Sequence, residues 1–382
     1  MHYIVFDLEW NQSPKGKEDS VPGMPFEIIE IGAVKLNEHL EKEGEYCELV
    51  CPQEYMTIHF QIRKMLSYTM KDLKKGRLFQ DVCKDFLAWC GDDAVFCTWG
   101  PGDLTELERN MNHFGVANHF PKPLLFLDLQ KIYSMEYQDG KVRSSLQHVV
   151  EELKIPETKG DYHRAISDAR YTAAVAQKLD FEQYGKYKSV DLYRIPDSVE
   201  DEFHLNFGTY EKYVSHGVED HEQCAQDKKL RIVKCYVCQK KAKARTPWFS
   251  DNQGRYFGVF ECTEHGLIKG RYRVKQDSET GLYYGIRILK QTDREGADAV
   301  VERKRRVEEK AARRLEARRQ EALERKQMAN AAMKDAFDKG LVEGVQPKKK
   351  KSGKKKKPAT KQAASQMPAT SQVGANSATR QI

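Results

Sequence analysis

Two acidic residues end the first apolar run of the chain and belong to a set of five residues that could do chemistry. Asp7 and Glu9 are two positions apart, so in a β-strand both side chains point to the same face. Like charges on one face of a buried sheet are costly unless a cation joins them. Asp103 follows a later apolar run and a Gly-Pro-Gly turn, and Asp168 lies in a helical pattern five residues after His163.

Four carboxylates and one imidazole suit the hydrolysis of a phosphodiester. Hard oxygen ligands in this number favour Mg²⁺ or Mn²⁺, and two such ions about 3.5–4 Å apart can flank a phosphate. A neutral imidazole beside the attacking water can accept its proton, which is the role we assign to His163. Each residue alone has an ordinary explanation, since an Asp after a strand often caps a helix and a single His is often structural.

Two metal-binding knuckles lie further along the chain, a Cys-x₂-Cys pair and, after 23 residues, a Cys-x₂-His pair: Cys235, Cys238, Cys262 and His265. Four soft or borderline ligands in two knuckles favour a tetrahedral structural Zn²⁺. A β unit of about 60 residues has a small core, so a bound ion can contribute much of its folding free energy. The alternatives are four unconnected residues, or exchange of the nearby His221 or Cys224 into the site.

The elements that must position these residues follow an alternating pattern over the first 188 residues. Apolar runs predict strands at 3–6, 27–36, 44–50, 93–99 and 124–129. Helical spacing predicts helices at 79–87, 103–113, 145–153 and 165–179. Three strands followed by alternating helices and strands indicate an α/β sheet of mixed direction.

The rest of the chain divides by composition. Residues 189–229 are acidic, aromatic and irregular and are predicted to be a linker, and 230–291 have hairpin patterns that predict a small zinc-ribbon-like β domain. Residues 292–340 are dominated by Glu, Arg, Lys and Ala without heptad spacing, which predicts a lone charged helix. Residues 341–382 are predicted to be a disordered Lys-rich tail.

The catalytic candidates form three ordered motifs that resemble those of the DEDDh 3′→5′ exonuclease superfamily. The motifs are residues 6–9 (Phe-Asp-Leu-Glu), 99–103 (Trp-Gly-Pro-Gly-Asp) and 163–169, the last with the His-x-Ala-x-x-Asp-Ala form of the "h" branch. Glu30, Gly32 and the Ser145-Leu146 pair also look like that superfamily. The resemblance covers residues 1 to about 185. Its finer features look like the bacterial KapD-like branch, which is related to the histone-mRNA exonucleases.

This resemblance implies a ribonuclease H-like fold, with a five-stranded mixed sheet and flanking helices, for an exonuclease domain at 1–188. Carried over position by position, the four carboxylates would bind two metal ions and His163 would be the general base. The products would be 5′-mononucleotides released from a 3′ end. Leu8 and Trp10 flank the first carboxylates and are candidates for contact with the terminal nucleotide. Packing at the strand end explains Trp10 equally well.

The net charge of +7 is localised in the tail. Residues 341–382 carry +9, which leaves −2 for the first 340 residues. Lysine blocks bind polyanions without sequence specificity, so we expect the basic tail to bind RNA or other polyanions. Anionic membrane surfaces and nuclear import are the alternatives. Basic and aromatic residues also interleave over 240–273, which suits a surface for single-stranded nucleic acid or a plain solvated face.

Composition narrows the class of protein. No run approaches the roughly 20 apolar residues of a membrane span, the N-terminus lacks a signal-peptide pattern, and an odd number of cysteines favours a reducing compartment. We therefore expect a cytoplasmic, metal-dependent 3′→5′ exonuclease without a membrane span, acting on single-stranded nucleic acid with RNA favoured over DNA. The alternatives are a DNA 3′-end exonuclease in proofreading or repair, and a KapD-like regulatory protein that acts by binding a partner.

Overall fold

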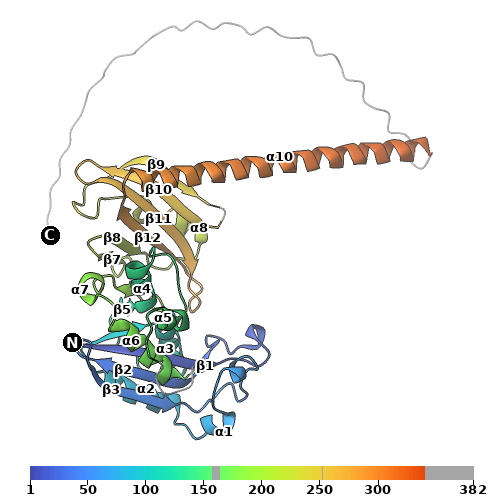
Figure 1. Ribbon diagram of the computed structural model, residues 1–382. Helices are drawn as coiled ribbons and strands as arrows, with labels where there is room; N and C mark the ends of the chain where they lie inside the picture. The colour runs from blue at the N-terminus through green and yellow to red at the C-terminus, as the bar shows by residue number, and fades with distance from the viewer. Residues whose placement is uncertain (157–163, 252, 340–382) are drawn as a thin grey trace, which may run out of the picture. The chain divides into compact units, whose positions relative to one another are not determined.

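The computed structural model describes residues 1–156, 164–251 and 253–339, and its N-terminal part is built on a mixed β-sheet (Figure 1). The strands of this sheet are His2–Asn11 (β1), Glu27–Leu36 (β2), Lys42–Leu49 (β3), Ala94–Thr98 (β4), Leu125–Asp128 (β5) and Ser189–Val190 (β6). Within the described residues their order is β3-β2-β1-β4-β5-β6. β2 is antiparallel to both β1 and β3, β4 is parallel to β1 and β5, and β6 is antiparallel to β5.

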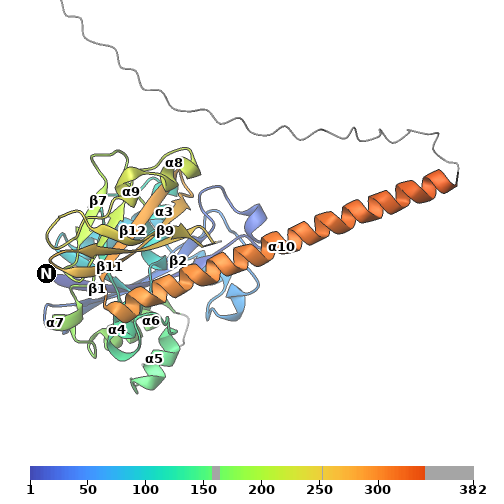
Figure 2. The same ribbon diagram turned by 90° about the horizontal axis from the view of Figure 1, so that it is seen from above.

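Helices connect and flank the strands (Figures 1 and 2). In the described part of the chain they are Met70–Leu73 (α1), Phe79–Cys90 (α2), Gly102–His113 (α3), Leu129–Tyr137 (α4), Leu146–Glu152 (α5), Ala165–Ala176 (α6), Phe181–Tyr184 (α7), His221–Ala225 (α8), Lys228–Arg231 (α9) and Arg294–Asp338 (α10). Short 3-10 turns occur at Lys17–Asp19 and Ile62–Lys64.

Side chains of β1 alternate between two cores. Ile4, Phe6 and Leu8 pack with residues of α2 and α3, whereas Val5 packs with residues of α4, α5 and α6. Because successive side chains of a strand point to opposite faces, Asp7 and Glu9 lie on the same face as Val5. The sequence pattern thus places both carboxylates on the face of the sheet that α6 covers.

The expected five-stranded sheet has a sixth, very short strand. β6 contributes two residues, Ser189 and Val190, which pair with Phe126 and Leu125 of β5. Two residues are too few to produce a periodic pattern, which is why the sequence prediction ended the sheet one strand early. The prediction of a mixed α/β sheet with flanking helices is confirmed.

A second, antiparallel sheet follows in the chain. Its strands are Phe203–Asn206 (β7), Tyr210–Val214 (β8), Lys243–Ser250 (β9), Arg255–Cys262 (β10), Gly266–Gln276 (β11) and Tyr283–Gln291 (β12). Their order, among the residues that the structure describes, is β7-β8-β12-β11-β10-β9.

Two corrections to the sequence prediction follow from this sheet. Residues 189–229 are not a linker, because they contain β6, β7, β8, α8 and α9. The aromatic and apolar residues that looked irregular there are the buried sides of short elements, as Phe203 and Val214 show. The unit predicted for 230–291 supplies only β9–β12, so the sheet is larger than a zinc ribbon of that segment would be.

The two sheets share an apolar contact. Val190 of β6 packs in one buried cluster with Phe203, Val214, Tyr284 and Ile286 of the second sheet. This cluster explains why Met1–Ala312 forms one compact unit rather than two domains on a linker.

The last element is the long charged helix that the composition predicted. α10 carries ion pairs with i,i+4 spacing, between Arg305 and Glu309, Arg306 and Glu302, and Lys304 and Glu308. Such pairs stabilise an exposed helix that has no apolar seam. The predicted Lys-rich tail at 341–382 lies outside the described residues. None of the helices in the described ranges combines the length and the apolar character that a membrane crossing requires.

Candidate active site

The carboxylates predicted from the first motif lie at the carboxyl-terminal half of β1. Asp7 pairs with Gly32 of β2 and Glu9 pairs with Glu30. Both acidic side chains are half-buried. The central position of β1 between β2 and β4 fixes them on a rigid part of the sheet, where few water molecules can screen their charges.

Asp168 reaches the same place from α6. It lies in the first turn of that helix, and a close approach of α6 to β2 brings the turn onto the sheet. A Cβ added at Gly32 would lie 2.1 Å from the backbone nitrogen of Ile166, so only glycine permits this packing. Carboxylate oxygens of Asp7, Glu9 and Asp168 all lie within 4.8 Å of one another.

Asp103 joins these residues from the first turn of α3. Its Oδ1 accepts a hydrogen bond from the backbone N–H of Leu8 at 3.2 Å, so it lies directly beside the strand segment that carries Asp7 and Glu9. The side chain is 7% exposed. β4, which is parallel to β1, ends four residues before α3 begins, and the carboxyl ends of parallel strands meet at one edge of the sheet.

The four carboxylates are close enough to repel one another, and the pKa values of Asp7, Glu9 and Asp103 are raised. Burial, followed by the charges of Asp103 and Asp168, raises the pKa of Asp7 well above its usual range. Burial and then Asp168 raise the pKa of Glu9 to about 8. Burial also raises the pKa of Asp103, to about 7, although its hydrogen bond from Leu8 opposes the rise. Divalent cations bound by these oxygens would remove the repulsion, so the donor set fits Mg²⁺ or Mn²⁺.

A comparison with known families identifies this part of the chain. Residues 4–176 match the family described as Exonuclease (RNase_T). This segment is an exonuclease domain. The matched segment of the exonuclease domain includes all four carboxylates, and it confirms the superfamily and the enzyme class, a 3′→5′ exonuclease, that the sequence motifs indicated.

Several solved structures are similar to the chain. The nuclease domain of 3′hExo, a DEDDh family member, bound to rAMP is 21% identical, with 50% of this chain and 96% of that chain covered and a TM-score of 0.41. Cell-death related nuclease 4 (CRN-4) is 16% identical, with 50% and 66% covered and a TM-score of 0.40. E. coli Exonuclease I in complex with a dT13 oligonucleotide is 11% identical, with 63% and 61% covered and a TM-score of 0.40. No curated protein matches the chain.

The structure places two of the three other residues predicted for the exonuclease site, Leu8 and Trp10. His163, the predicted general base, lies outside the described residues. Leu8 is 4% exposed and packs in the core on the opposite face from the carboxylates, a position that does not favour contact of its side chain with a nucleotide. The ring of Trp10 is half-buried, 5.6 Å from that of Phe26, and approaches Gly102 at the start of α3.

An ion pair behind the carboxylates was not assigned a role from the sequence. Glu30 of β2 is fully buried, and its Oε1 accepts hydrogen bonds from Nε of Arg164 at 2.9 Å and from a terminal guanidinium nitrogen at 2.7 Å. Its Oε2 accepts the backbone N–H of Ala165 at 3.1 Å, so the first turn of α6 is capped from another element. The signal in the sequence was a glutamate inside an apolar strand, since such a residue needs a cationic partner.

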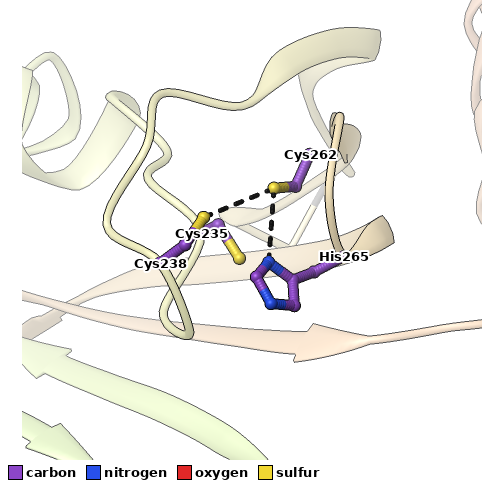
Figure 3. Close-up of side chains that lie close together, drawn as sticks. All are labelled: Cys235, Cys238, Cys262 and His265. Atoms are coloured by element: carbon purple, nitrogen blue, oxygen red, sulfur yellow. Dashed lines mark hydrogen bonds between the residues drawn. The ribbon is translucent and has the colours of Figure 1, made fainter.

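The predicted zinc ligands converge in the second sheet. Cys238 Sγ lies 3.6 Å from Cys262 Sγ, which lies 3.7 Å from Nδ1 of His265, and Cys235 completes the group (Figure 3). Ligands of a tetrahedral zinc with bonds of about 2.1–2.3 Å are separated by roughly 3.6–3.8 Å. Backbone hydrogen bonding from Glu264, followed by the approach of His265, lowers the pKa of Cys262 to about 6. A thiolate is the form that binds metal, so this donor set fits Zn²⁺.

Cys224, which the sequence offered as an alternative zinc ligand, lies away from the zinc ligands. It packs with Tyr213, Leu230 and Tyr272 in a separate buried cluster. Its thiol is therefore an interior apolar group.

Proposed function

We propose that the exonuclease domain is a metal-dependent 3′→5′ exonuclease that releases 5′-mononucleotides from single-stranded nucleic acid, with RNA as the favoured substrate. The observation that carries the proposal is the convergence of Asp7, Glu9 and Asp168 within 4.8 Å, with Asp103 beside them. The preference for RNA rests on the resemblance of the sequence to the branch related to histone-mRNA exonucleases. One neighbour is named for recognition of the histone mRNA stem-loop.

In this proposal the four carboxylates would hold two Mg²⁺ or Mn²⁺ ions. Bound there, the ions would supply activation of water and charge stabilisation for the leaving 3′ oxygen. The residues of the chain contribute position: β1 fixes Asp7 and Glu9, the Leu8 N–H fixes Asp103, and the capped first turn of α6 fixes Asp168. His163 precedes the first residue of α6 by two positions in the sequence and would accept the proton of the attacking water.

We also propose that Cys235, Cys238, Cys262 and His265 hold a structural Zn²⁺. Four protein ligands leave no open coordination position, so the ion would stabilise the second sheet and would not catalyse. The buried residues around the ligands, among them Val233, Phe260 and Leu289, form a small cluster. Metal–ligand bonds would add folding free energy where this apolar core is limited.

The experiment that tests the proposal uses the full chain and a 5′-labelled single-stranded RNA, with DNA of the same sequence in parallel. Each is incubated with Mg²⁺ or Mn²⁺, and Asp7→Ala protein serves as the control. We expect a ladder that shortens by one nucleotide at a time from the 3′ end, faster on RNA and absent with Asp7→Ala. Faster shortening of DNA would favour the proofreading or repair alternative. No shortening of either substrate would reject the proposal and favour a regulatory protein that binds a partner.

A further inference from the structure

One face of the second sheet carries a row of cations. Side chains of β11 alternate, so that Ile268 and Tyr272 point into buried clusters while Arg271, Arg273 and Lys275 point to the opposite face. Both arginines are exposed, and Lys275 is half-buried. Residues two apart in a strand are separated by about 7 Å, so the three cations form an evenly spaced line.

The strand register adds a fourth cation to this face of the sheet. In the antiparallel pairing Ile288 of β12 is the partner of both Arg271 of β11 and Lys212 of β8. Directly paired residues lie on the same face of a sheet. Lys212 is therefore on the face of Arg271, one strand beyond β12. We call Lys212, Arg271, Arg273 and Lys275 the basic row.

The cations of the basic row differ in their pairing from other cations of the same sheet. In the described residues none of its four members forms an ion pair, whereas other arginines of the same sheet do: Arg245 with Glu261, Arg255 with Asp251, and Arg287 with Glu211. The members of the basic row therefore repel one another, and this repulsion disfavours their charged forms. Burial, followed by Lys131 and the three other members, lowers the pKa of Lys212 to about 8. Burial and then Arg273 lower the pKa of the half-buried Lys275.

Lys131 connects this face to the active-site edge of the first sheet. Its Nζ donates to the backbone oxygen of Tyr187 at 3.0 Å and to the hydroxyl of Tyr210 at 3.4 Å, and Tyr210 lies two residues before Lys212. Lys131 is also three residues after Asp128, which pairs with Thr98 at the end of β4. The chain runs from Thr98 directly to α3 and Asp103. Lys131 therefore links the strand that carries Lys212, through Tyr210, to the edge of the first sheet at which β4 and β5 end.

We propose that the basic row binds the phosphate backbone of the nucleic-acid strand whose 3′ end occupies the active site. Cations that repel one another on one face are stabilised by a polyanion, and an extended strand can contact the three cations along β11 in turn and Lys212 beside them. Continuity with the active-site edge favours the substrate strand over an acidic protein. The inference rests on the proposed function for the identity of its ligand, and it adds a second contact region remote from the reacting phosphate.

The test measures binding separately from cleavage. Full-length Asp7→Asn protein, with and without the added changes Arg271→Gln and Arg273→Gln, is titrated into a fluorescently labelled 30-nucleotide RNA without added divalent metal. Loss of two phosphate contacts should weaken binding about tenfold and reduce the slope of log K against log salt by about 1.4. The matched control is Lys228→Gln with Lys234→Gln, which removes the same charge; α9, which carries Lys228, packs on the other face of the sheet through Leu230.

Several outcomes would overturn the inference. These are unchanged RNA affinity in the Arg271→Gln, Arg273→Gln protein, equal weakening in the control, or displacement of the RNA by poly-glutamate at the same charge concentration. A thermal melt of each variant verifies folding, and the melting temperature should not fall because the changes relieve repulsion.

The proposed function is assessed in a separate arm with Asp7 restored. The p-nitrophenyl ester of thymidine 5′-monophosphate has a single phosphate group and no strand beyond it, so its hydrolysis does not depend on backbone contacts with the basic row. Its hydrolysis with Mn²⁺ should be the same in the parent and in the Arg271→Gln, Arg273→Gln protein. A parent that fails to hydrolyse the ester argues against the exonuclease proposal, whereas the RNA titration alone decides the inference on the basic row.

Discussion

Glu30 and Arg164 form a two-point ion pair that links the middle of β2 to the residue before α6. Three N–O contacts of 2.7–3.1 Å join the two side chains, and Glu30 is fully buried while Arg164 is 31% exposed. Since the same carboxylate also accepts the N–H of Ala165, the pair sets the start of the helix that carries Asp168. Burial and the surrounding carboxylates raise the pKa of Glu9, and the charge of Arg164 opposes part of that rise.

Replacing Glu30 by Gln should impair positioning as well as stability. The neutral side chain cannot balance Arg164, and we expect a loss of about 2 kcal/mol in unfolding free energy. We also expect kcat to fall at least tenfold, because displacement of Asp168 disturbs the geometry of the reacting groups. Urea denaturation and RNA cleavage rates measure the two effects.

The matched control for Glu30→Gln is Glu45→Gln, since Glu45 of β3 pairs with Arg170 of the same helix but both side chains are partly exposed. It should cost less than about 1 kcal/mol and leave kcat nearly unchanged; equal effects at the two positions would contradict the positioning role.

Asp7→Asn and Asp168→Asn should separate activity from stability. Each change removes a proposed metal ligand, so RNA cleavage should be lost. Each also removes one like charge from a cluster within 4.8 Å, so the metal-free protein should melt at the same or a higher temperature than the parent. Added Mn²⁺ should raise the melting temperature of the parent only. Appreciable residual cleavage by either variant would argue against the ligand assignment.

His163→Ala should slow the chemical step by about 10²–10⁴-fold, the usual effect of losing a general base. Stabilisation by Mn²⁺ should persist, because the four carboxylates are intact. Single-turnover cleavage and a melt with Mn²⁺ measure the two properties. His148→Ala, on exposed α5 surface, is the control and should cleave normally. A cleavage rate for His163→Ala close to that of the parent would mean that another group accepts the proton.

Cys235→Ser should release zinc and destabilise the second sheet without changing the carboxylate cluster. Elemental analysis of the parent should give one zinc per chain, and the variant should have much less. Cys224→Ser is the matched control, since that thiol is equally buried but packs away from the ligands. Equal zinc content in the parent and in Cys235→Ser would reject the site, as would zinc loss in Cys224→Ser.

Local patterns sufficed for the elements and for the residue types of both sites. Alternation along β1 put Asp7 and Glu9 on one face, and the spacing of two knuckles marked Cys235 and Cys262 as members of one cluster, as the structure confirms. These inferences succeed because strand periodicity and knuckle geometry involve only neighbouring residues. The long helix was predicted for the same reason.

The short strands of the second sheet and the pairing of charges depend on contacts between residues that are distant in the chain. β7 and β8 were missed because short strands have little periodicity, and they are recognisable only through the pairing of β8 with β12 and of β7 with β8. The roles of Glu30 and of the basic row depend on β2 meeting α6 and on β8 lying beside β12, which no local pattern encodes. The sequence by itself therefore determined which side chains could bind metal ions. Tertiary structure decided which charges form ion pairs within the described residues and which do not, because pairing depends on how the sheets and helices pack in three dimensions.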